Sequence, residues 1–432
     1  MSQTIVLKDG RLIDYAGDRI ADVVIDTSSG MITEVGTGLA AETEIDCEGL
    51  VVSPGFVDLH VHLREPGLEA AETILTGSRA AARGGFTAVV AMPNTNPAMD
   101  SASVVEQVLA AGRQALCEIS PSAAISIGRN GEQLSPMGEL LGAGVRIFTD
   151  DGNGVQDARF MRRALEYAGG LPNGGSPVVL AQHCEVEALT EGGVMHEGEW
   201  SAKLGLGGQP SEAEDLMVMR DITLARLTGV HVHFQHLSTA GSVAMVRAAK
   251  AGGLPVTAEA TPHHFTLTDA SCAGFDPVFK VHPPLRTAHD VAAVRAGLAD
   301  GTIDAIATDH APHTPESKDR SFDDAPPGML GLETAFALAY TELELPLTDL
   351  LALFTWRPAA IAGLSDHQGS ALSPGRHANI AVIDLEHRWT VRGDNLASIA
   401  RNTPFEGRQL NGRVRHTFYR GEQVLANFEV TR

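Results

Sequence analysis

The 432-residue chain has few cysteines and few basic residues. Its four cysteines, Cys47, Cys117, Cys184 and Cys272, are widely scattered and form no Cys-x-x-Cys pair, which favours reduced thiols over a disulfide framework. Lysine and arginine total 32 against 54 acidic residues, a formal net charge of -22. This charge argues against a nucleic-acid or anionic-membrane surface, because both require clustered cations. A small anionic substrate can still bind where single Arg or His residues or a metal offset the field.

Long apolar runs are also missing, since charged residues interrupt every run before it reaches membrane-spanning length. The first residues, Met-Ser-Gln-Thr-Ile-Val, do not have the basic-then-apolar pattern of a signal peptide, so we expect a cytoplasmic protein. No Gly-x-Gly-x-x-Gly follows the first strand of the central region, which disfavours a dinucleotide-binding fold. Hydrophobic content of 44% and charged content of 20% are typical of a soluble globular protein that can bury a large core.

Both ends of the chain predict short strands. At the start these are Thr4 to Leu7, Ile20 to Ile25 and Ile32 to Val35, with breaks at Asp9-Gly10 and Ser28-Ser29-Gly30. Near the end they are Asn379 to Ile383, Val414 to Tyr419 and Gln423 to Ala426. Because chain termini often lie close together, we expect residues 1–53 and 372–432 to form one small β-sandwich-like domain.

The region between the two ends alternates strands with helices. Helical patterns cover Ala70 to Arg83, Asp157 to Ala168 and Ser211 to Leu227. Eight strands separated by such helices predict an α/β fold with a (β/α)8 TIM-like barrel over residues 54–371, rather than an open doubly wound sheet. The candidate strands are Val51 to Val57, Thr87 to Met92, Glu118 to Ile127, Val145 to Phe148, Val178 to Gln182, His231 to Gln235, Val256 to Glu259 and Ala305 to Ala307.

The first of these strands leads into His60-Val-His62 and then Arg64. Residues two apart on a strand project to the same side, so His60 and His62 can offer two imidazoles to one point, which is two thirds of a zinc site. An isolated His-x-His is as often a pair of ordinary polar residues at a strand end. Arg64 favours the functional interpretation, because a fixed cation beside two ligands suits an anionic substrate.

Polar residues also follow the other strands of the central region. Barrel enzymes build their sites at the C-terminal ends of the strands, so these residues would share one rim of imidazoles and carboxylates, which zinc accepts as ligands. They are Asn94 after the second strand, Asp150 and Asp151 after the fourth, His183 and Glu185 after the fifth, His236 after the sixth, and Asp309, His310 and His313 after the eighth.

Six longer motifs extend these single residues: Pro54-Gly-Phe-Val-Asp-Leu-His-Val-His-Leu-Arg-Glu-Pro-Gly67, Met92-Pro-Asn-Thr-Asn-Pro97, Phe148-Thr-Asp-Asp-Gly152, Pro262-His-His264, Pro283-Pro-Leu-Arg286 and Thr308-Asp-His-Ala-Pro-His313. In these motifs the chain resembles the long bacterial class I dihydroorotases of the amidohydrolase superfamily. The resemblance implies one or two zinc ions per subunit, held by His60, His62, His183, His236 and Asp309, with Asp151 shared between two metal positions.

The neighbouring residue Asp150 is the other candidate for the carboxylate shared between the two metal positions. Alternation favours Asp151, which lies on the same side of the strand as Thr149 and Ile147. Related hydantoinases and allantoinases usually place a carboxylated lysine there. The lysines of this chain are Lys8, Lys203, Lys250, Lys280 and Lys318, and none of them ends the fourth strand. Either Asp151 bridges the metals, or a second metal is weak or absent.

By resemblance, the reaction is the reversible cyclisation of N-carbamoyl-L-aspartate to L-dihydroorotate with loss of water, the third step of de novo pyrimidine biosynthesis. Asp309 would act as metal ligand and as catalytic acid and base. The family commonly has Asn at position 282 and a larger apolar residue at 327, so His282 and Pro327 are departures that we expect to change affinity or pH response. The implied substrate-binding residues are His62, Arg64, Asn94, His282, His313, Pro327 and Gly328.

Two other functions stay open at this point. One is a different cyclic amidase, of the hydantoinase or allantoinase type. The other is a non-catalytic scaffold for aspartate transcarbamoylase, which the six candidate metal ligands disfavour. A homodimer and a complex with aspartate transcarbamoylase are both open as assemblies. We interpret most remaining histidines, including His231 and His233, as structural, and consider His263 and His264 as residues that could orient a metal ligand.

Overall fold

The computed structural model describes residues 4–172 and 178–432. Residues 1–3, the beginning of the stretch considered above as a signal, lie outside the described residues. None of the helices in the described part of the chain is both long and apolar enough to span a membrane.

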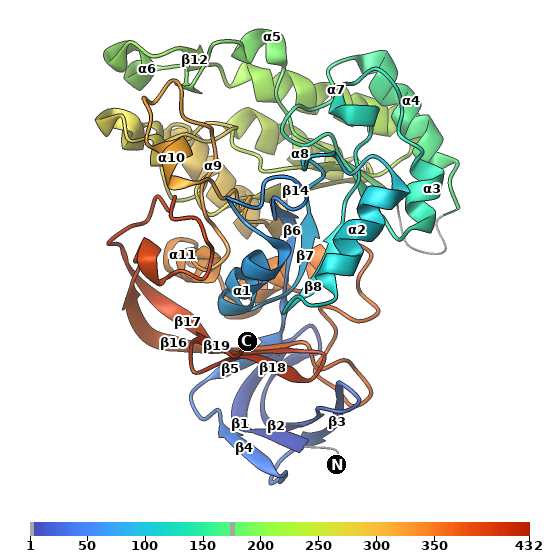
Figure 1. Ribbon diagram of the computed structural model, residues 1–432, viewed down its shortest axis with the longest axis vertical. Coiled ribbons are helices and arrows are strands. Elements are labelled where there is room, and N and C mark those ends of the chain that lie inside the picture. Colours follow the sequence, from blue (N-terminus) through green and yellow to red (C-terminus); the bar gives the residue numbers. More distant parts are fainter. Residues whose placement is uncertain (1–3, 173–177) are drawn as a thin grey trace.

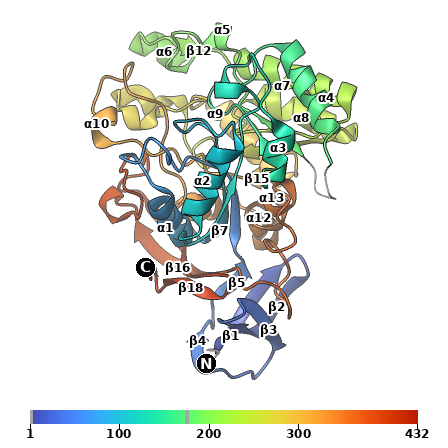
Figure 2. The same cartoon turned by 45° about the vertical axis from the view of Figure 1, so that its right-hand side comes forward.

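The two ends of the chain form one nine-stranded sheet. Figures 1 and 2 show it at one end of the molecule, together with the C-terminus. The N-terminal strands join the C-terminal ones where β5 pairs antiparallel with β16, Val52 opposite Val382. The strands are β1 (Thr4–Asp14), β2 (Gly17–Asp26), β3 (Met31–Gly36), β4 (Thr43–Asp46), β5 (Val51–Pro54), β16 (Ile380–Thr390), β17 (Gln409–Tyr419), β18 (Glu422–Ala426) and β19 (Glu429–Val430).

The central region contains a three-stranded and a five-stranded parallel sheet. Parallel bridges connect their edges, from Val61 to His310 and from Ala123 to Phe148. Because all these strands run in the same direction, their C-terminal ends lie on one side. The strands are β6 (Phe56–Val61), β7 (Phe86–Ala91), β8 (Glu118–Pro121), β9 (Ile147–Phe148), β10 (Val179–Gln182), β13 (Val232–Phe234), β14 (Val256–Ala260) and β15 (Ala305–Ile306).

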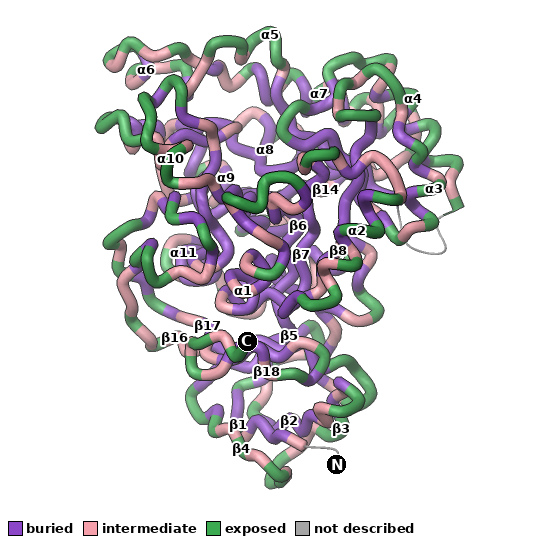
Figure 3. Tube along the Cα trace, viewed as in Figure 1, coloured by how far each residue is buried: buried purple, intermediate pink, exposed green. Residues whose placement is uncertain are grey.

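Helices connect most of these strands, as the α/β prediction requires. The main connecting helices are α1 (Ile74–Gly84), α2 (Ala102–Gly112), α3 (Met137–Gly142), α4 (Ala158–Gly169), α7 (Glu212–Thr228), α8 (Ala240–Ala251) and α9 (Ala288–Ala299). The traces of β6 and β7 are buried, whereas the segments at α5 (Glu187–Thr190) and α6 (Glu199–Leu204) are largely exposed (Figure 3). The remaining helices are α10 (Pro315–Lys318), α11 (Ala335–Glu342), α12 (Leu347–Phe354) and α13 (Trp356–Ile361).

Several predicted boundaries were wrong, for local reasons. The helix predicted from Ala70 begins after Thr73, whose side chain caps it by accepting from the Thr76 backbone N–H. The predicted break at Asp9-Gly10 is a register shift within one long β1. The third predicted strand ends at Pro121, a residue that has no N–H to donate.

The predicted strand from Val51 to Val57 is two strands that belong to different sheets. The chain passes between them at Gly55, whose N–H donates to the Asn379 carbonyl 2.8 Å away. A Cβ on Gly55 would lie 2.2 Å from the Thr87 side chain, so only glycine allows this close approach. This crossing directs β6, and therefore His60 and His62, into the parallel sheets.

Four phenylalanines pack where β6 and β7 begin. Phe354 of α12 lies 5.1 Å from Phe56 and 6.2 Å from Phe86, measured between ring centroids, and Phe336 of α11 lies 5.6 Å from Phe56. All four rings are buried, so they anchor α11 and α12 against the N-terminal ends of the strands.

We expect Phe354→Ala to lower the free energy of unfolding by about 3–5 kcal/mol, the usual cost of deleting a buried aromatic ring. Urea unfolding followed by circular dichroism measures this. Tyr15→Ala removes a ring that is 57% exposed and is the control, with an expected change within about 0.5 kcal/mol. Equal unfolding midpoints for the two variants would contradict the packing role of Phe354.

Candidate metal centre

The six predicted metal ligands lie together at the C-terminal ends of the parallel strands. His60 belongs to β6, His62 follows it, and the others follow β9, β10, β13 and β15. All six are buried, with at most 6% of any residue exposed. The predicted ligands are thus brought to one place; their role as ligands stays a prediction. They are His60, His62, Asp151, His183, His236 and Asp309.

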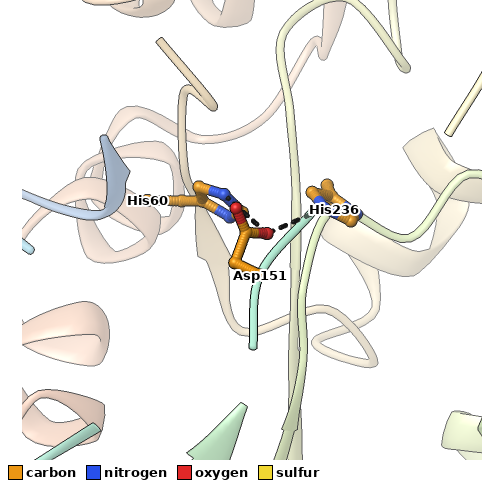
Figure 4. A group of neighbouring side chains, drawn as sticks. All are labelled: His60, Asp151 and His236. Atoms are coloured by element: carbon orange, nitrogen blue, oxygen red, sulfur yellow. Dashed lines mark ion pairs between the residues drawn. The ribbon is translucent and has the colours of Figure 1, made fainter. Parts of the chain in front are cut away.

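Two carboxylates face the imidazoles at the centre of this cluster. Asp151 Oδ1 lies 3.2 Å from His60 Nε2, 3.7 Å from His183 Nδ1 and 3.8 Å from His236 Nε2. Asp309 Oδ1 lies 2.9 Å from His62 Nε2 and 3.5 Å from His60 Nε2. Figure 4 shows Asp151 between His60 and His236. Two sets of three ligand atoms are therefore close enough to hold a cation each, His60, Asp151 and His236 in one and His60, His62 and Asp309 in the other.

The hydrogen bonding of these residues tests whether a metal fits. His60 Nε2, Asp151 Oδ1 and His236 Nδ1 are buried and have no hydrogen-bond partner in the described part of the chain. Leaving a buried polar atom unpaired costs about 1–3 kcal/mol, so three in one cluster need an explanation. Imidazole nitrogen and carboxylate oxygen are ligands that zinc accepts. The residues present fit a metal ion.

Negative charge dominates the cluster. Burial by itself would raise the pKa of Asp151, but the charge of His60 and the nearby imidazoles of His183 and His236 hold it well below its usual range. The pKa of Asp309 is likewise lowered, since His60 and His62 outweigh the effect of burial. Burial would lower the pKa of His60, yet the two carboxylates raise it well above its usual value. A cation is therefore favoured at this position.

Further residues hold the imidazoles in place. His60 Nδ1 lies 2.9 Å from Glu259 Oε1, and the other oxygen of Glu259 lies 3.0 Å from His233 Nε2. His183 Nε2 lies 2.9 Å from Glu185 Oε2. A carboxylate at the second nitrogen fixes the tautomer and orientation of a ligating histidine. His233, interpreted above as structural, therefore supports the centre through Glu259.

Glu259 was not predicted as a site residue, although it ends the predicted strand Val256 to Glu259. Its position at a strand end was the available signal. His264, considered above as an orienting residue, instead bonds Thr261 Oγ1 and the Pro283 carbonyl at 2.7 and 2.9 Å. His263 is buried and its Nε2 has no partner among the described residues.

Asp58 connects β6 to the segment that follows β15. Its Oδ1 accepts hydrogen bonds from the backbone N–H groups of His60 and Thr308, both at 3.0 Å, and its Oδ2 accepts one from Thr308 Oγ1 at 2.6 Å. Thr308 directly precedes Asp309. This buried carboxylate therefore fixes the backbone at His60 relative to Asp309, a role that the sequence analysis did not assign.

The choice of Asp151 over Asp150 agrees with the geometry. Asp150 turns away from the cluster, accepting hydrogen bonds from the backbone N–H of Ser126 at 3.0 Å and from the Ser126 hydroxyl. Asp151 is the carboxylate that faces the imidazoles. The parity argument from strand alternation thus predicted which of the two points into the site.

A cavity of about 180 Å³ opens beside the cluster. Arg64 lies in it, and its Nε donates to the Pro312 carbonyl at 3.1 Å. Burial lowers the pKa of Arg64 to about 10, so the guanidinium stays charged at neutral pH. All seven predicted substrate-binding residues line this cavity: His62, Arg64, Asn94, His282, His313, Pro327 and Gly328.

The loop that carries Pro327 and Gly328 is held against the cavity. His313 Nε2 donates to the Pro327 carbonyl at 2.7 Å, which leaves Nδ1 of His313 without a proton when the ring is neutral. Burial, reinforced by the charge of Arg64, lowers the pKa of His313 to about 3, so the ring is neutral. Gly328 has φ of 130°, and a Cβ there would lie 2.8 Å from His313 Nε2. A side chain at position 328 would displace His313.

Comparison with known proteins relates this geometry to a family. A family model described as Dihydro-orotase-like matches residues 49–242. A protein of Pelotomaculum thermopropionicum named dihydroorotase is 49% identical over 427 residues, which cover 98% of both chains. One of Streptomyces coelicolor with the same name is 47% identical over 440 residues and covers 100% of both chains. The chain belongs to the dihydroorotase family.

Solved structures of a hydantoinase and a dihydropyrimidinase have the same fold. An L-hydantoinase (dihydropyrimidinase) from Arthrobacter aurescens superposes with a TM-score of 0.88 at 24% identity and covers 100% of this chain and 98% of its own. A dihydropyrimidinase from Brevibacillus agri gives a TM-score of 0.85 at 22% identity, over 100% and 96% of the two chains. Because both identities are below 25%, the two structures show only that this chain of the dihydroorotase family has the same fold.

The adjacent aspartates provide a matched pair for testing the metal centre. We expect Asp151→Asn to reduce bound metal strongly, because it removes a charge that faces three imidazoles. Asp150→Asn should keep the metal content of the unmodified protein, since Asp150 bonds Ser126 instead. Inductively coupled plasma mass spectrometry of the purified proteins measures the metal content of the two variants. Equal metal content in the two variants would show that Asp151 is not a ligand.

Glu259→Gln should weaken metal binding about 10- to 100-fold, the usual effect of losing the carboxylate that orients a ligating histidine. Glu118→Gln is the matched control, because Glu118 forms a similar 2.9 Å contact with His367 away from the centre. Competition with a fluorescent chelator gives both affinities. The orienting role of Glu259 fails if the two variants bind metal equally well.

Proposed function

We propose that this chain is a class I dihydroorotase that interconverts N-carbamoyl-L-aspartate and L-dihydroorotate at a zinc centre. The observation that carries the proposal is the cluster of six buried metal-ligand candidates, five of which line one cavity together with Arg64 and Asn94. The candidate metal ligands and the two candidate anion-binding residues would then act on a single small substrate. A metal set this complete disfavours a non-catalytic scaffold.

We also infer the architecture that supports this activity. Residues 54–371 would form a closed (β/α)8 barrel, for which the edge bridges Val61–His310 and Ala123–Phe148 are the support. Residues 1–53 and 372–432 would form the smaller β domain, with Pro54 as the last residue of β5. Catalytic barrels of this type place their sites at the C-terminal ends of the strands.

The cavity fits the proposed substrate in charge. Arg64 would take the substrate carboxylate through paired charge-assisted hydrogen bonds, with Asn94 as a second donor. Asn94 Oδ1 lies 2.9 Å from His62 Nδ1, so that imidazole N–H holds the amide oxygen and leaves Asn94 Nδ2, 3.5 Å from Asp151 Oδ2, on the side of the cavity. His282, His313, Pro327 and Gly328 would enclose the rest of the molecule.

Zinc would be held by His60, His62, His183, His236, Asp151 and Asp309. If two ions bind, they would share Asp151. When bound, zinc would act as a Lewis acid on the cyclic amide carbonyl and activate the attacking water. Asp309 would move the proton: its carboxylate accepts one during ring opening and returns it to the departing nitrogen. Its lowered pKa keeps it ionised and ready to accept that proton. Ring closure would use the reverse transfer.

A substrate panel tests the proposal directly. We expect hydrolysis of L-dihydroorotate, and formation of it from N-carbamoyl-L-aspartate, at a kcat/KM far above that for hydantoin or allantoin, which lack the carboxylate that Arg64 would bind. Arg64→Lys should raise KM for dihydroorotate about tenfold or more with unchanged zinc content, because an ammonium cannot reproduce the planar fork of arginine. Preferential hydrolysis of hydantoin would assign the chain to the other cyclic amidases.

Asp309→Asn should slow both directions by at least about 10²-fold, since an amide cannot shuttle the proton. Progress curves started from either substrate at the same pH measure the two rates. Full activity in either direction with Asn at position 309 would mean that another group carries the proton.

A further inference from the structure

His282 lines the cavity, and its environment contains a residue not yet assigned any role. Its Nε2 lies 3.1 Å from Nε2 of Gln209, in the short strand β12 (Gly208–Gln209). Gln209 is 1% exposed and does not line the cavity itself. The two residues are 73 positions apart, so no local motif predicts their contact.

The second contact of Gln209 fixes the direction of this hydrogen bond. Gln209 Nε2 also donates to the Gly193 carbonyl at 2.9 Å. A carbonyl can only accept, so the amide atom between Gly193 and His282 is the nitrogen and not the oxygen. Its second hydrogen then points to His282 Nε2, which must accept it with a lone pair. A neutral imidazole with a lone pair on Nε2 carries its proton on Nδ1.

We propose that Gln209 is a positioning residue that holds His282 as the neutral Nδ1–H tautomer, so that Nδ1 donates a hydrogen bond to a carboxylate or carbonyl oxygen of the substrate. His282 Nδ1 has no hydrogen-bond partner within residues 4–172 and 178–432 and is not among the buried unpartnered atoms. His282 lines the cavity, and the proposal directs this nitrogen toward it. Without Gln209 the ring is free to adopt the Nε2–H tautomer, which histidine prefers in water.

The protonation state agrees with this assignment. Burial lowers the pKa of His282, and the nearby cations of Lys280 and Arg286 act in the same direction, against the opposing effect of Glu185. The ring is therefore neutral at physiological pH, and its tautomer decides whether Nδ1 donates or accepts. An asparagine at this position would offer its amide N–H as a donor whatever its neighbours are. Histidine needs a partner such as Gln209 to behave in the same way.

Gln209 is itself held firmly. β12 pairs with β11 (Met195–His196), with Gln209 opposite His196. The backbone carbonyl of Gln209 accepts from Arg286 Nη1 at 3.0 Å. A Cβ on Gly193 would lie 2.4 Å from Gln209 Cγ, so the glycine leaves room for the glutamine side chain. These contacts hold the backbone and Cγ of Gln209, and turning the amide over would bring its oxygen against the Gly193 carbonyl.

Nitrogen NMR of the zinc-loaded, substrate-free protein tests the tautomer without reference to activity. With 15N-labelled histidine, the His282 signals are those absent from His282→Asn. We expect Nδ1 at the shift of a protonated nitrogen and Nε2 at the shift of an unprotonated one. The opposite pattern in the unmodified protein overturns the proposal. Only the identity of the substrate rests on the proposed function. If the protein shows the expected pattern but does not hydrolyse dihydroorotate, the proposed function is refuted and the tautomer assignment stands.

A kinetic double-mutant cycle tests the effect on substrate binding. Gln209→Met keeps the length of the side chain but removes the amide. We expect it to raise KM for dihydroorotate about tenfold with kcat within about twofold, as for loss of one hydrogen bond to a charged group. In a His282→Asn background the same change should alter KM by less than about twofold, because the asparagine donor needs no tautomer. An equal rise in both backgrounds would mean that Gln209 acts only through packing.

The control uses a second glutamine–histidine pair. Gln423 Nε2 lies 2.9 Å from His416 Nδ1 in the nine-stranded sheet, and neither residue lines the cavity. Gln423→Met removes the same kind of contact and should leave KM unchanged. If Gln423→Met raises KM as much as Gln209→Met does, the effect is not specific to the cavity and the proposal fails.

Discussion

The burial of two carboxylates among imidazoles is the constraint on which the rest of this structure depends. Asp151 and Asp309 are almost completely removed from water, and an uncompensated buried ion costs several kcal/mol. The histidines around them supply hydrogen bonds and positive potential, and three buried polar atoms remain without a protein partner in the described residues. A cation at this point would pair the remaining atoms, so the cluster fits a metal ion.

Holding so many polar groups in place also needs backbone conformations that are unfavourable by themselves. Arg64, His236 and Asp309 have φ of 62°, 33° and 46°, in the left-handed region that residues with a Cβ seldom adopt. Such conformations cost about 1–3 kcal/mol each and persist where surrounding contacts enforce them. Asp58, bonded to Thr308 beside Asp309, is one such contact. Asp58 belongs to β6, so this strand helps to hold the backbone beside Asp309 in place.

Much of this could be predicted from the sequence, because its strongest signals are local. The alternation of strands and helices predicted the α/β fold, and the extended motif after His60 predicted the dihydroorotase family, which the similar proteins confirm. Strand periodicity predicted that Asp151 and not Asp150 faces the site. Element boundaries were less accurate where single residues decide them, as at Thr73, Pro121 and Gly55.

What could not be predicted rests on pairs that are distant in the chain. Glu259 is 199 positions from His60, and Gln209 is 73 from His282. Neither pair has a periodic pattern or a motif, and each side chain alone is an ordinary polar residue. Only the folded arrangement shows that Glu259 orients His60 and that Gln209 faces the ring of His282.

The central claim is that the cluster around Asp151 and Asp309 binds zinc and that this zinc is required for hydrolysis of dihydroorotate. It is tested most directly by removing metal with a chelator and titrating zinc back, with bound zinc and hydrolysis measured on the same samples. The account predicts no activity without metal and activity that rises in proportion to bound zinc until one or two ions per chain are present. Full hydrolysis by the metal-free protein would contradict it.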